Sequence, residues 1–174
     1  MKKTVVITYV GGQEVDYLLQ LLQRVAADQG VSFGYHRPHT PSVAACAERL
    51  TVRLGADNLC LEGCKLEGDV LLALEEMELR RGLPYVAKGK RVIVCNQHRL
   101  PMAVAVGTKS YPTDCMARTL AEGYPIWQVK RKEIAPAYVS ALLLRALDLT
   151  KEQVATYVED TDTVERAFCL NDYQ

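Results

Sequence analysis

Short apolar segments alternate with helix-forming segments along much of this chain. Residues 4–9 and 69–74 are apolar runs of strand length, and helical segments follow them from residues 15 and 75. A third apolar run covers residues 91–95. Strands that alternate with helices in this way form a parallel sheet with right-handed crossovers. The chain is therefore expected to fold as an α/β protein.

Three other segments extend this prediction. Residues 48–54 alternate apolar and polar side chains, the period of a half-exposed strand, and we expect this strand at the edge of the sheet. Residues 33–41 carry two prolines, a glycine and two histidines, which predicts an irregular loop. Residues 114–122 predict a helix. The expected fold is a three-layer, Rossmann-like α/β domain with a mainly parallel sheet and helices on both faces.

The last third of the chain is helical in character. Residues 134–147 are apolar almost all round, which predicts a helix buried in the core or against a partner chain. Thr150 and Gln153 have the spacing of a capping box, so another helix is expected to begin there. With 174 residues, 49% of them hydrophobic, the chain is long enough for one sizeable core. We expect residues 1–174 to form a single domain.

Charge and hydropathy exclude some partners. The 21 basic and 21 acidic residues are interspersed and sum to zero, so no basic stripe is present to neutralise the phosphates of a nucleic acid. The first strand begins almost at Met1, without a signal-peptide pattern, and no apolar run reaches about 18 residues. We expect a cytoplasmic protein that contacts neither nucleic acid nor membrane.

The cysteine pattern argues against disulfides and metal. In a cytoplasmic chain of this length, cysteines are expected to be reduced thiols. Only Cys60 and Cys64 are close in sequence, and they lack the additional cysteines of an iron–sulfur cluster or a zinc site. We therefore predict no metal site on this chain. The full set is Cys46, Cys60, Cys64, Cys95, Cys115 and Cys169.

The sequence singles out no catalytic residue. The nucleophile motif G-x-S-x-G is absent, and His36, His39 and His98 lie outside any H-E-x-x-H pattern, so they are predicted to be loop histidines. Glu75, Glu76 and Glu78 follow a strand, at the end where open α/β sheets bind ligands. They fit acid–base groups, but stabilisation of a helix N-terminus through its dipole is the favoured interpretation.

The most suggestive turn lies between the first strand and the first helix. Its residues Gly11, Gly12 and Gln13 match neither a P-loop nor the dinucleotide fingerprint, and Glu14 would repel a phosphate at the helix N-terminus. The sequence therefore favours a turn over a phosphate site. If the chain carries a ligand site, we expect it at these three residues, with Asn96 and Arg37 contributed by neighbouring loops.

Four segments together resemble the γ-type subunit or domain of 2-oxoacid:ferredoxin oxidoreductases. They are the strand–GGQ–helix start, GDVLLALEEMELRRGLPYVAKGKRVIVCNQHRLP at residues 68–101, YPTD, and the later ALLLRALDLTKEQV. The most similar member is the β subunit of indolepyruvate:ferredoxin oxidoreductase. The middle segment keeps the family's order of residues, and the matching positions are Asp69, Leu71, Ala73, Glu75, Glu78, Arg80, Asn96, Gln97 and Pro101.

The resemblance implies a role inside a larger enzyme. Enzymes of this family oxidatively decarboxylate a 2-oxoacid on thiamine diphosphate, pass electrons through iron–sulfur clusters to ferredoxin, and release an acyl-CoA. The resemblance implies that this chain is the small subunit beside a larger catalytic subunit, which carries the thiamine diphosphate and the clusters. CoA is expected in the complex, ferredoxin is an indirect partner, and the isolated chain is expected to bind no cofactor and to be inactive.

The chain departs from the family at the glycine turn. The family loop usually contains G-x-G-G-Q-G, but Tyr9 and Glu14 replace its first and last glycines. Of a second signature, an aromatic–glycine pair before Arg-Gly-Gly, only residues 33–34 and Arg37 remain. Two alternatives therefore stay open. One is a stand-alone nucleotide- or CoA-binding module, and the other is a divergent, homo-oligomeric interaction protein without the family's activity.

Overall fold

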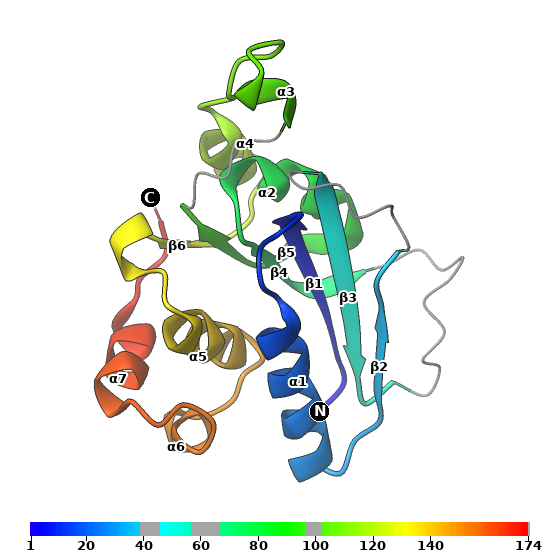
Figure 1. The fold of residues 1–174 in the computed structure, drawn as a ribbon. Coiled ribbons are helices and arrows are strands. Elements are labelled where there is room, and N and C mark those ends of the chain that lie inside the picture. The colour runs from blue at the N-terminus through cyan, green and yellow to red at the C-terminus, as the bar shows by residue number, and fades with distance from the viewer. Residues whose placement is uncertain (39–45, 57–66, 97–101, 174) are drawn as a thin grey trace.

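A six-stranded sheet forms the centre of the computed structural model, which describes residues 1–38, 46–56, 67–96 and 102–173. The strand order is β2-β3-β1-β4-β5-β6 (Figure 1). β1, β4, β5 and β6 pair in parallel, whereas β3 runs antiparallel to both β1 and β2. The strands are β1 (Lys3–Val10), β2 (Phe33–His36), β3 (Ala47–Leu54), β4 (Gly68–Ala73), β5 (Val86–Cys95) and β6 (Ile126–Val129).

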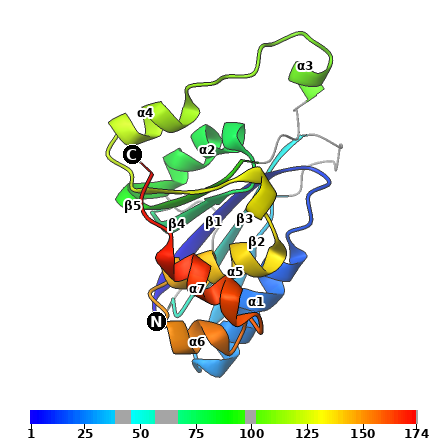
Figure 2. The same cartoon turned by 90° about the vertical axis from the view of Figure 1, so that its left-hand side faces the viewer.

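Helices cover both faces of the sheet. In Figure 2, α2 and α4 lie above it and α1, α5, α6 and α7 lie below it, while α3 stands away from the body of the fold. The prediction of a three-layer α/β fold with a mainly parallel sheet is confirmed. The helices are α1 (Asp16–Asp28), α2 (Glu76–Gly82), α3 (Met102–Ala105), α4 (Cys115–Ala121), α5 (Pro136–Ala146), α6 (Lys151–Ala155) and α7 (Thr161–Cys169), with short 3-10 turns η1 (Leu83–Tyr85) and η2 (Arg131–Glu133).

β1 connects two hydrophobic cores, because its successive side chains point to opposite faces of the sheet. Val5 and Ile7 belong to the larger core, under α1, α5, α6 and α7. Val6 belongs to the smaller core, which lies under α2 and α4. This double burial explains why residues 4–9 form an almost continuous apolar run instead of an alternating one.

α5 is buried by the chain itself. Every residue of it from Tyr138 to Leu144 is buried, and all of these side chains except Ser140 belong to the larger core, which also includes residues of α1, α6 and α7. The all-round apolar pattern therefore needs no partner chain to cover it. The predicted capping box at the start of α6 is confirmed, with the Gln153 amide N–H donating to Thr150 Oγ1 at 3.3 Å.

Two predictions about the first half of the sheet are wrong. Residues 33–36 of the predicted irregular loop form β2, which pairs with β3, so His36 is a strand residue. β3 consequently lies between β2 and β1 and is not an edge strand. Its alternation has a different cause: the polar side chains Arg49 and Thr51 face the α2 side, where the Arg49 guanidinium lies 3.7 Å from the centre of the Tyr85 ring.

Among the residues described, no helix has both the length and the apolar character needed to cross a bilayer.

Gly82, at the end of α2, lies where this helix packs closely on the sheet. A Cβ at this position would lie 2.4 Å from Leu71 Cδ1 and 3.1 Å from Thr8 Cγ2. Because Leu71 is fully buried, Gly82→Ala is expected to lower the free energy of unfolding by about 1–3 kcal/mol through overpacking. Urea denaturation followed by circular dichroism measures this change.

A double-mutant cycle identifies the clash. Leu71→Ala removes the methyl groups that the new Cβ would meet, so the combined effect of the two substitutions should be smaller than the sum of their single effects. Strictly additive losses would contradict this account of the α2 packing.

Candidate functional site

The turn after β1 lies at the carboxyl end of the parallel strands. Gly12 has φ of +89°, a left-handed conformation that favours glycine. The Gly11 amide N–H donates to the Cys46 carbonyl oxygen at 2.7 Å, and the Gln13 amide N–H donates back to the Val10 carbonyl oxygen at 3.0 Å. The turn is tight, and both of these amides are used inside the chain.

The Gln13 side chain holds two neighbouring strands together. Its Oε1 accepts a hydrogen bond from the Val10 amide at 2.8 Å, and its Nε2 donates to the Leu74 carbonyl oxygen at 3.2 Å. Val10 ends β1 and Leu74 follows β4, so one side-chain amide bridges the ends of two adjacent parallel strands. We call this arrangement the Gln13 clamp.

Arg37 reaches the same turn from the residue after β2. Its guanidinium donates to Asp16 Oδ1 at 2.8 Å, in the first turn of α1, and lies 5.9 Å from the centre of the Tyr9 ring. The predicted site residues Gly12, Gln13 and Arg37 therefore come together although more than twenty positions separate Arg37 from the glycines.

These residues border a cavity of about 420 Å³ whose charged groups are mainly acidic. Burial raises the pKa of Tyr9 and of Tyr17 above the ordinary value, so both phenols stay neutral. The lining contains three carboxylates and one guanidinium, a balance that disfavours a phosphate. The lining residues are Tyr9, Gly12, Gln13, Glu14, Val15, Asp16, Tyr17, Arg37 and Glu48.

A second, more apolar cavity of about 310 Å³ borders the same turn. Gly12, Gln13 and Glu14 line both cavities, and the start of α5 contributes apolar side chains to the second one. Glu14 is its only charged lining residue. Such a surface suits an apolar or cationic group better than an anion. Its remaining lining residues are Tyr17, Leu74, Ile134, Pro136 and Val139.

Asn96 lies apart from these cavities. It follows β5, which β4 separates from β1, and it lines neither of the two cavities beside the turn. Its amide N–H donates to the Val129 carbonyl oxygen at 2.9 Å. Its side-chain Oδ1 is buried and accepts no hydrogen bond from the part of the chain that the structure describes.

A buried acidic pair occupies the carboxyl end of β4. Glu75 caps α2, with its Oε2 accepting from the Met77 amide at 2.7 Å, and its other oxygen accepts from the Tyr111 hydroxyl. Glu78 pairs with Arg81 one turn later. Burial raises the pKa of both carboxyls, that of Glu78 to about 7. The capping contact of Glu75 fits the helix-stabilising interpretation of this residue.

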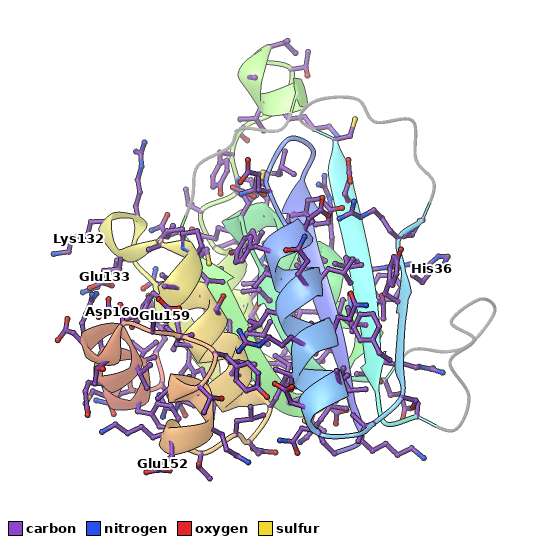
Figure 3. The ribbon with its side chains drawn as sticks, turned by 60° about the horizontal axis from the view of Figure 1, so that its bottom comes forward. His36, Lys132, Glu133, Glu152, Glu159 and Asp160 are labelled. Carbon is purple, nitrogen blue, oxygen red and sulfur yellow. The ribbon has the colours of Figure 1, made fainter. Side chains whose placement is uncertain are left out.

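The link between Tyr111 and Glu75 was not predictable from local sequence, because 36 positions separate the two residues. His36 lies on β2, at the edge of the sheet opposite β6 (Figure 3). The described residues contain no group of three or more His, Cys, Asp or Glu side chains that could hold a metal ion. His39, His98, Cys60, Cys64, Gln97 and Pro101 lie outside the described residues.

No protein-family model matches the chain, and no curated protein matches it either. Among solved structures with a similar fold is the pyruvate oxidoreductase subunit PORC from Thermotoga maritima, at 13% identity and a TM-score of 0.61, covering 95% of this chain and 90% of that chain. Another is the gamma subunit of a keto/oxoacid ferredoxin oxidoreductase from Geobacter sulfurreducens, at 15% identity and a TM-score of 0.58, covering 97% and 93%.

A third structure is the 2-oxoglutarate:ferredoxin oxidoreductase from Magnetococcus marinus, with 2-oxoglutarate, coenzyme A and succinyl-CoA bound. It is 11% identical with a TM-score of 0.57, and the match covers 95% of this chain but only 31% of that longer chain. At such low identities, these likenesses show a common fold. All three neighbours are oxidoreductases or subunits of oxidoreductases, named for pyruvate, a keto/oxoacid and 2-oxoglutarate, and a shared fold does not by itself give this chain their activity.

The Gln13 clamp should contribute measurably to stability. Gln13→Ala removes two hydrogen bonds to the backbone and is expected to lower the free energy of unfolding by about 1–3 kcal/mol. Gln20→Ala, on the exposed side of α1, is the matched control and should change it by less than about 0.5 kcal/mol. Equal losses in the two variants, measured by urea denaturation, would show that the clamp is not what stabilises this turn.

Glu78 should make stability depend on pH. Its pKa is about 7 in the folded chain and near 4.5 in the unfolded chain, so folding favours the protonated form. Its contribution to stability is complete below about pH 4.5 and is lost as the pH rises through 7. Glu78→Gln should remove this loss and, at pH 8, raise the free energy of unfolding by on the order of 1 kcal/mol.

The control for this experiment is Glu122→Gln, which removes an exposed carboxylate that pairs with Arg80. It should leave the difference in stability between pH 5 and pH 8 unchanged. A Glu78→Gln variant whose thermal stability follows the same pH profile as the parent would rule out a carboxyl that titrates near neutrality.

Proposed function

We propose that this chain is the small, γ-type subunit of a 2-oxoacid:ferredoxin oxidoreductase. The observation that carries the proposal is the extent of the fold match: two subunits of such enzymes are covered to at least 90% of their length by at least 95% of this chain. The sequence resemblance of residues 68–101 to the γ-type subunits supports it independently. The chain would work in a hetero-oligomer, where it supports CoA-dependent oxidative decarboxylation.

We propose that a larger partner subunit carries the decarboxylation and electron-transfer chemistry of this enzyme class. Iron–sulfur clusters need several cysteine ligands, and the described residues contain no such group. The acidic cavity beside the Gln13 clamp does not fit the phosphates of thiamine diphosphate or CoA, because three carboxylates face one guanidinium. Thiamine diphosphate, the clusters, CoA and the contact with ferredoxin are therefore proposed to belong to the complex, outside this cavity.

The turn itself is proposed to contact the partner or an uncharged part of a ligand. Gly11, Gly12 and Gln13 hold the end of β1 in place, and Arg37 fixes the start of α1 through Asp16. Asn96 is the separate candidate, because its buried Oδ1 has an open acceptor position among the described residues. These five positions are the proposed binding residues.

The substrate class is proposed from sequence resemblance. The segments described above resemble the β subunit of the indolepyruvate enzyme, so we propose an arylpyruvate substrate. The structural neighbours are named for pyruvate, a keto/oxoacid and 2-oxoglutarate. A complex that contains this chain should reduce ferredoxin with indolepyruvate or phenylpyruvate faster than with pyruvate or 2-oxoglutarate.

The alternatives make different predictions. A stand-alone nucleotide- or CoA-binding module would bind its ligand without a partner, and the acidic balance of the cavity argues against this. A homo-oligomeric interaction protein would form a complex without the large subunit. Because α5 is covered by the chain's own core, it gives no support to an interface on that helix.

Anaerobic affinity purification of the tagged chain from its native cells tests the proposal. We expect a larger subunit that contains iron–sulfur clusters in roughly equimolar amount, and an eluate that reduces ferredoxin only when both CoA and a 2-oxoacid are added. Mass spectrometry identifies the partner, and an unrelated protein with the same tag is the control. Recovery of this chain alone, inactive and without bound iron, would overturn the subunit proposal.

A further inference from the structure

The outer edge of β6 borders a cavity whose lining has a surplus of positive charge. β6 is the last strand of the sheet, and only β5 among the strands pairs with it. The cavity beside it has a volume of about 940 Å³. Arg91, Lys130 and Arg145 line this cavity, and Asp172 is its single acidic lining residue. In a chain whose charges sum to zero, this surplus marks a local surface that attracts anions.

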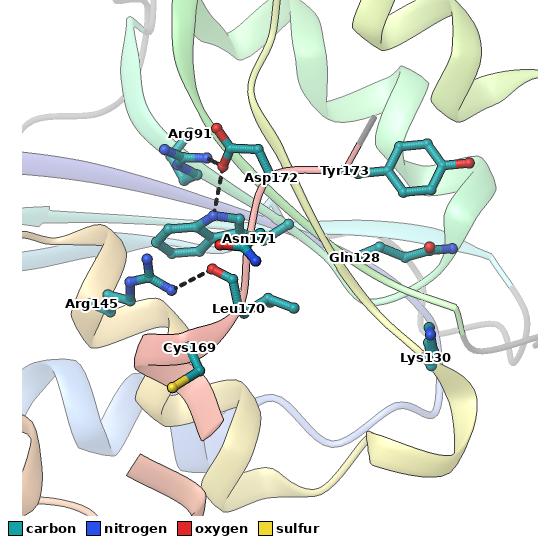
Figure 4. Close-up of a pocket in the computed structure, with 10 residues that line it drawn as sticks. Arg91, Gln128, Lys130, Arg145, Cys169, Leu170, Asn171, Asp172 and Tyr173 are labelled. Atoms are coloured by element: carbon teal, nitrogen blue, oxygen red, sulfur yellow. Dashed lines mark hydrogen bonds and ion pairs between the residues drawn. The ribbon is translucent and has the colours of Figure 1, made fainter. Parts of the chain in front are cut away.

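Residues 170–173 of the chain cross the outer edge of β6, and none of them is a strand residue (Figure 4). The Tyr173 amide N–H donates to the carbonyl oxygen of Ile126 in β6 at 2.7 Å. One Asp172 carboxylate oxygen accepts from the Trp127 indole N–H at 2.8 Å and also pairs with Arg91. The segment therefore binds the edge in two ways, through its backbone and through an acidic side chain.

The bound segment leaves most of the positive charge uncompensated. Arg145 donates to the carbonyl oxygens of Ala167 and Leu170 at 2.6 and 2.9 Å, but it makes no ion pair with the described residues. Burial and the nearby Arg91 guanidinium lower the pKa of Arg145, so an additional anion would be favourable there.

The positive surface continues beyond β6. Lys130, Arg131 and Lys132 follow the strand directly, and all three are exposed. The side chain of Lys132 points away from the body of the fold (Figure 3). A partner that lies along β6 would thus meet a row of cations after it passes the cavity.

The geometry favours an extended acidic peptide over an aromatic ligand. The guanidinium carbons of Arg91 and Arg145 lie 4.2 and 4.1 Å from the centre of the Trp127 ring. Because both guanidinium groups already lie close to this ring, stacking of an aromatic ligand on the indole is disfavoured. The backbone groups of an edge strand remain available for pairing, as the Tyr173 contact illustrates.

We infer that the β6 edge is a docking surface for an extended, acidic segment of a partner polypeptide, and that residues 170–173 occupy part of it until the partner displaces them. The segment is held by few contacts. Residues 171–173 are exposed, and their polar contacts are one backbone hydrogen bond to β6 and the Asp172 contacts with Trp127 and Arg91, while the Leu170 carbonyl accepts from Arg145. This inference does not require the proposed enzymatic role, because it rests on the edge itself.

Trp127 reports directly on this surface, because it is the single tryptophan of the chain. The probe is a seven-residue peptide, blocked at both ends, in which two aspartates alternate with valine and threonine. The same peptide with asparagine in place of aspartate is the matched neutral probe. We expect the acidic peptide to change the tryptophan fluorescence of the full chain in a saturable, salt-sensitive way, and the neutral peptide to leave it unchanged.

Three variants locate the site. Asp172→Asn weakens the internal competitor and should tighten binding of the acidic peptide roughly fivefold. Lys130→Gln should weaken it about threefold, because one exposed cation of the cavity is lost. Lys88→Gln, an exposed lysine of β5 outside this cavity, is the control and should not alter the affinity.

Several results would overturn the inference. They are an absent fluorescence response, an equal response to the asparagine peptide, and an equal response to inorganic phosphate, which would define a site for small anions instead. An affinity that Asp172→Asn leaves unchanged would show that residues 170–173 do not compete for the surface. The two proposals can fail separately. If the acidic peptide binds but affinity purification from the native cells recovers no large subunit, the docking surface is supported and the proposed function is contradicted.

Discussion

The burial of β1 on both faces is the constraint on which the rest of the structure depends. From Val5 to Val10 every residue of this strand is buried, and its two neighbours differ in direction, with β3 antiparallel and β4 parallel. Both cores rest on it, and the Gln13 clamp fixes its end against β4. The polar groups of the Gln13 side chain are used in the clamp, so the GGQ turn stabilises the contact between β1 and β4. A ligand at this turn would therefore meet mainly backbone groups and the neighbouring carboxylates.

The sequence predicted the elements whose signal is local. The runs that became β1, β4 and the end of β5 are continuous because both faces of these strands are covered, and the capping box at Thr150 marks α6 by itself. β2 and β6 have four residues each, too few for a reliable pattern, and their formation depends on pairing with β3 and β5. The edge position of residues 48–54 was mispredicted because stacking of Arg49 on Tyr85 hides a polar face.

The candidate site was predictable to a similar degree. The carboxyl-end rule for parallel strands directed attention to Gly12 and Gln13, which line a cavity at the end of β1, and the β2–β3 pairing brings Arg37 beside them. The rule does not give strand order, so it could not show that β4 separates Asn96 from the turn. Contacts between distant segments, such as Tyr111 with Glu75 and Asp172 with Arg91, leave no local signal at all.

The surface of the chain indicates what kind of interface a partner would form with it. Among the described residues, the exposed large hydrophobic side chains are Tyr35, Val106 and Tyr173, which come from three separate segments and form no common patch in the fold. An obligate interface of the usual apolar kind needs such a patch. The charges are locally unbalanced at two cavities, with carboxylates in excess beside the Gln13 clamp and cations in excess beside β6. Association through this part of the surface would therefore depend on charge complementarity and backbone pairing, so it would be specific in register and sensitive to ionic strength.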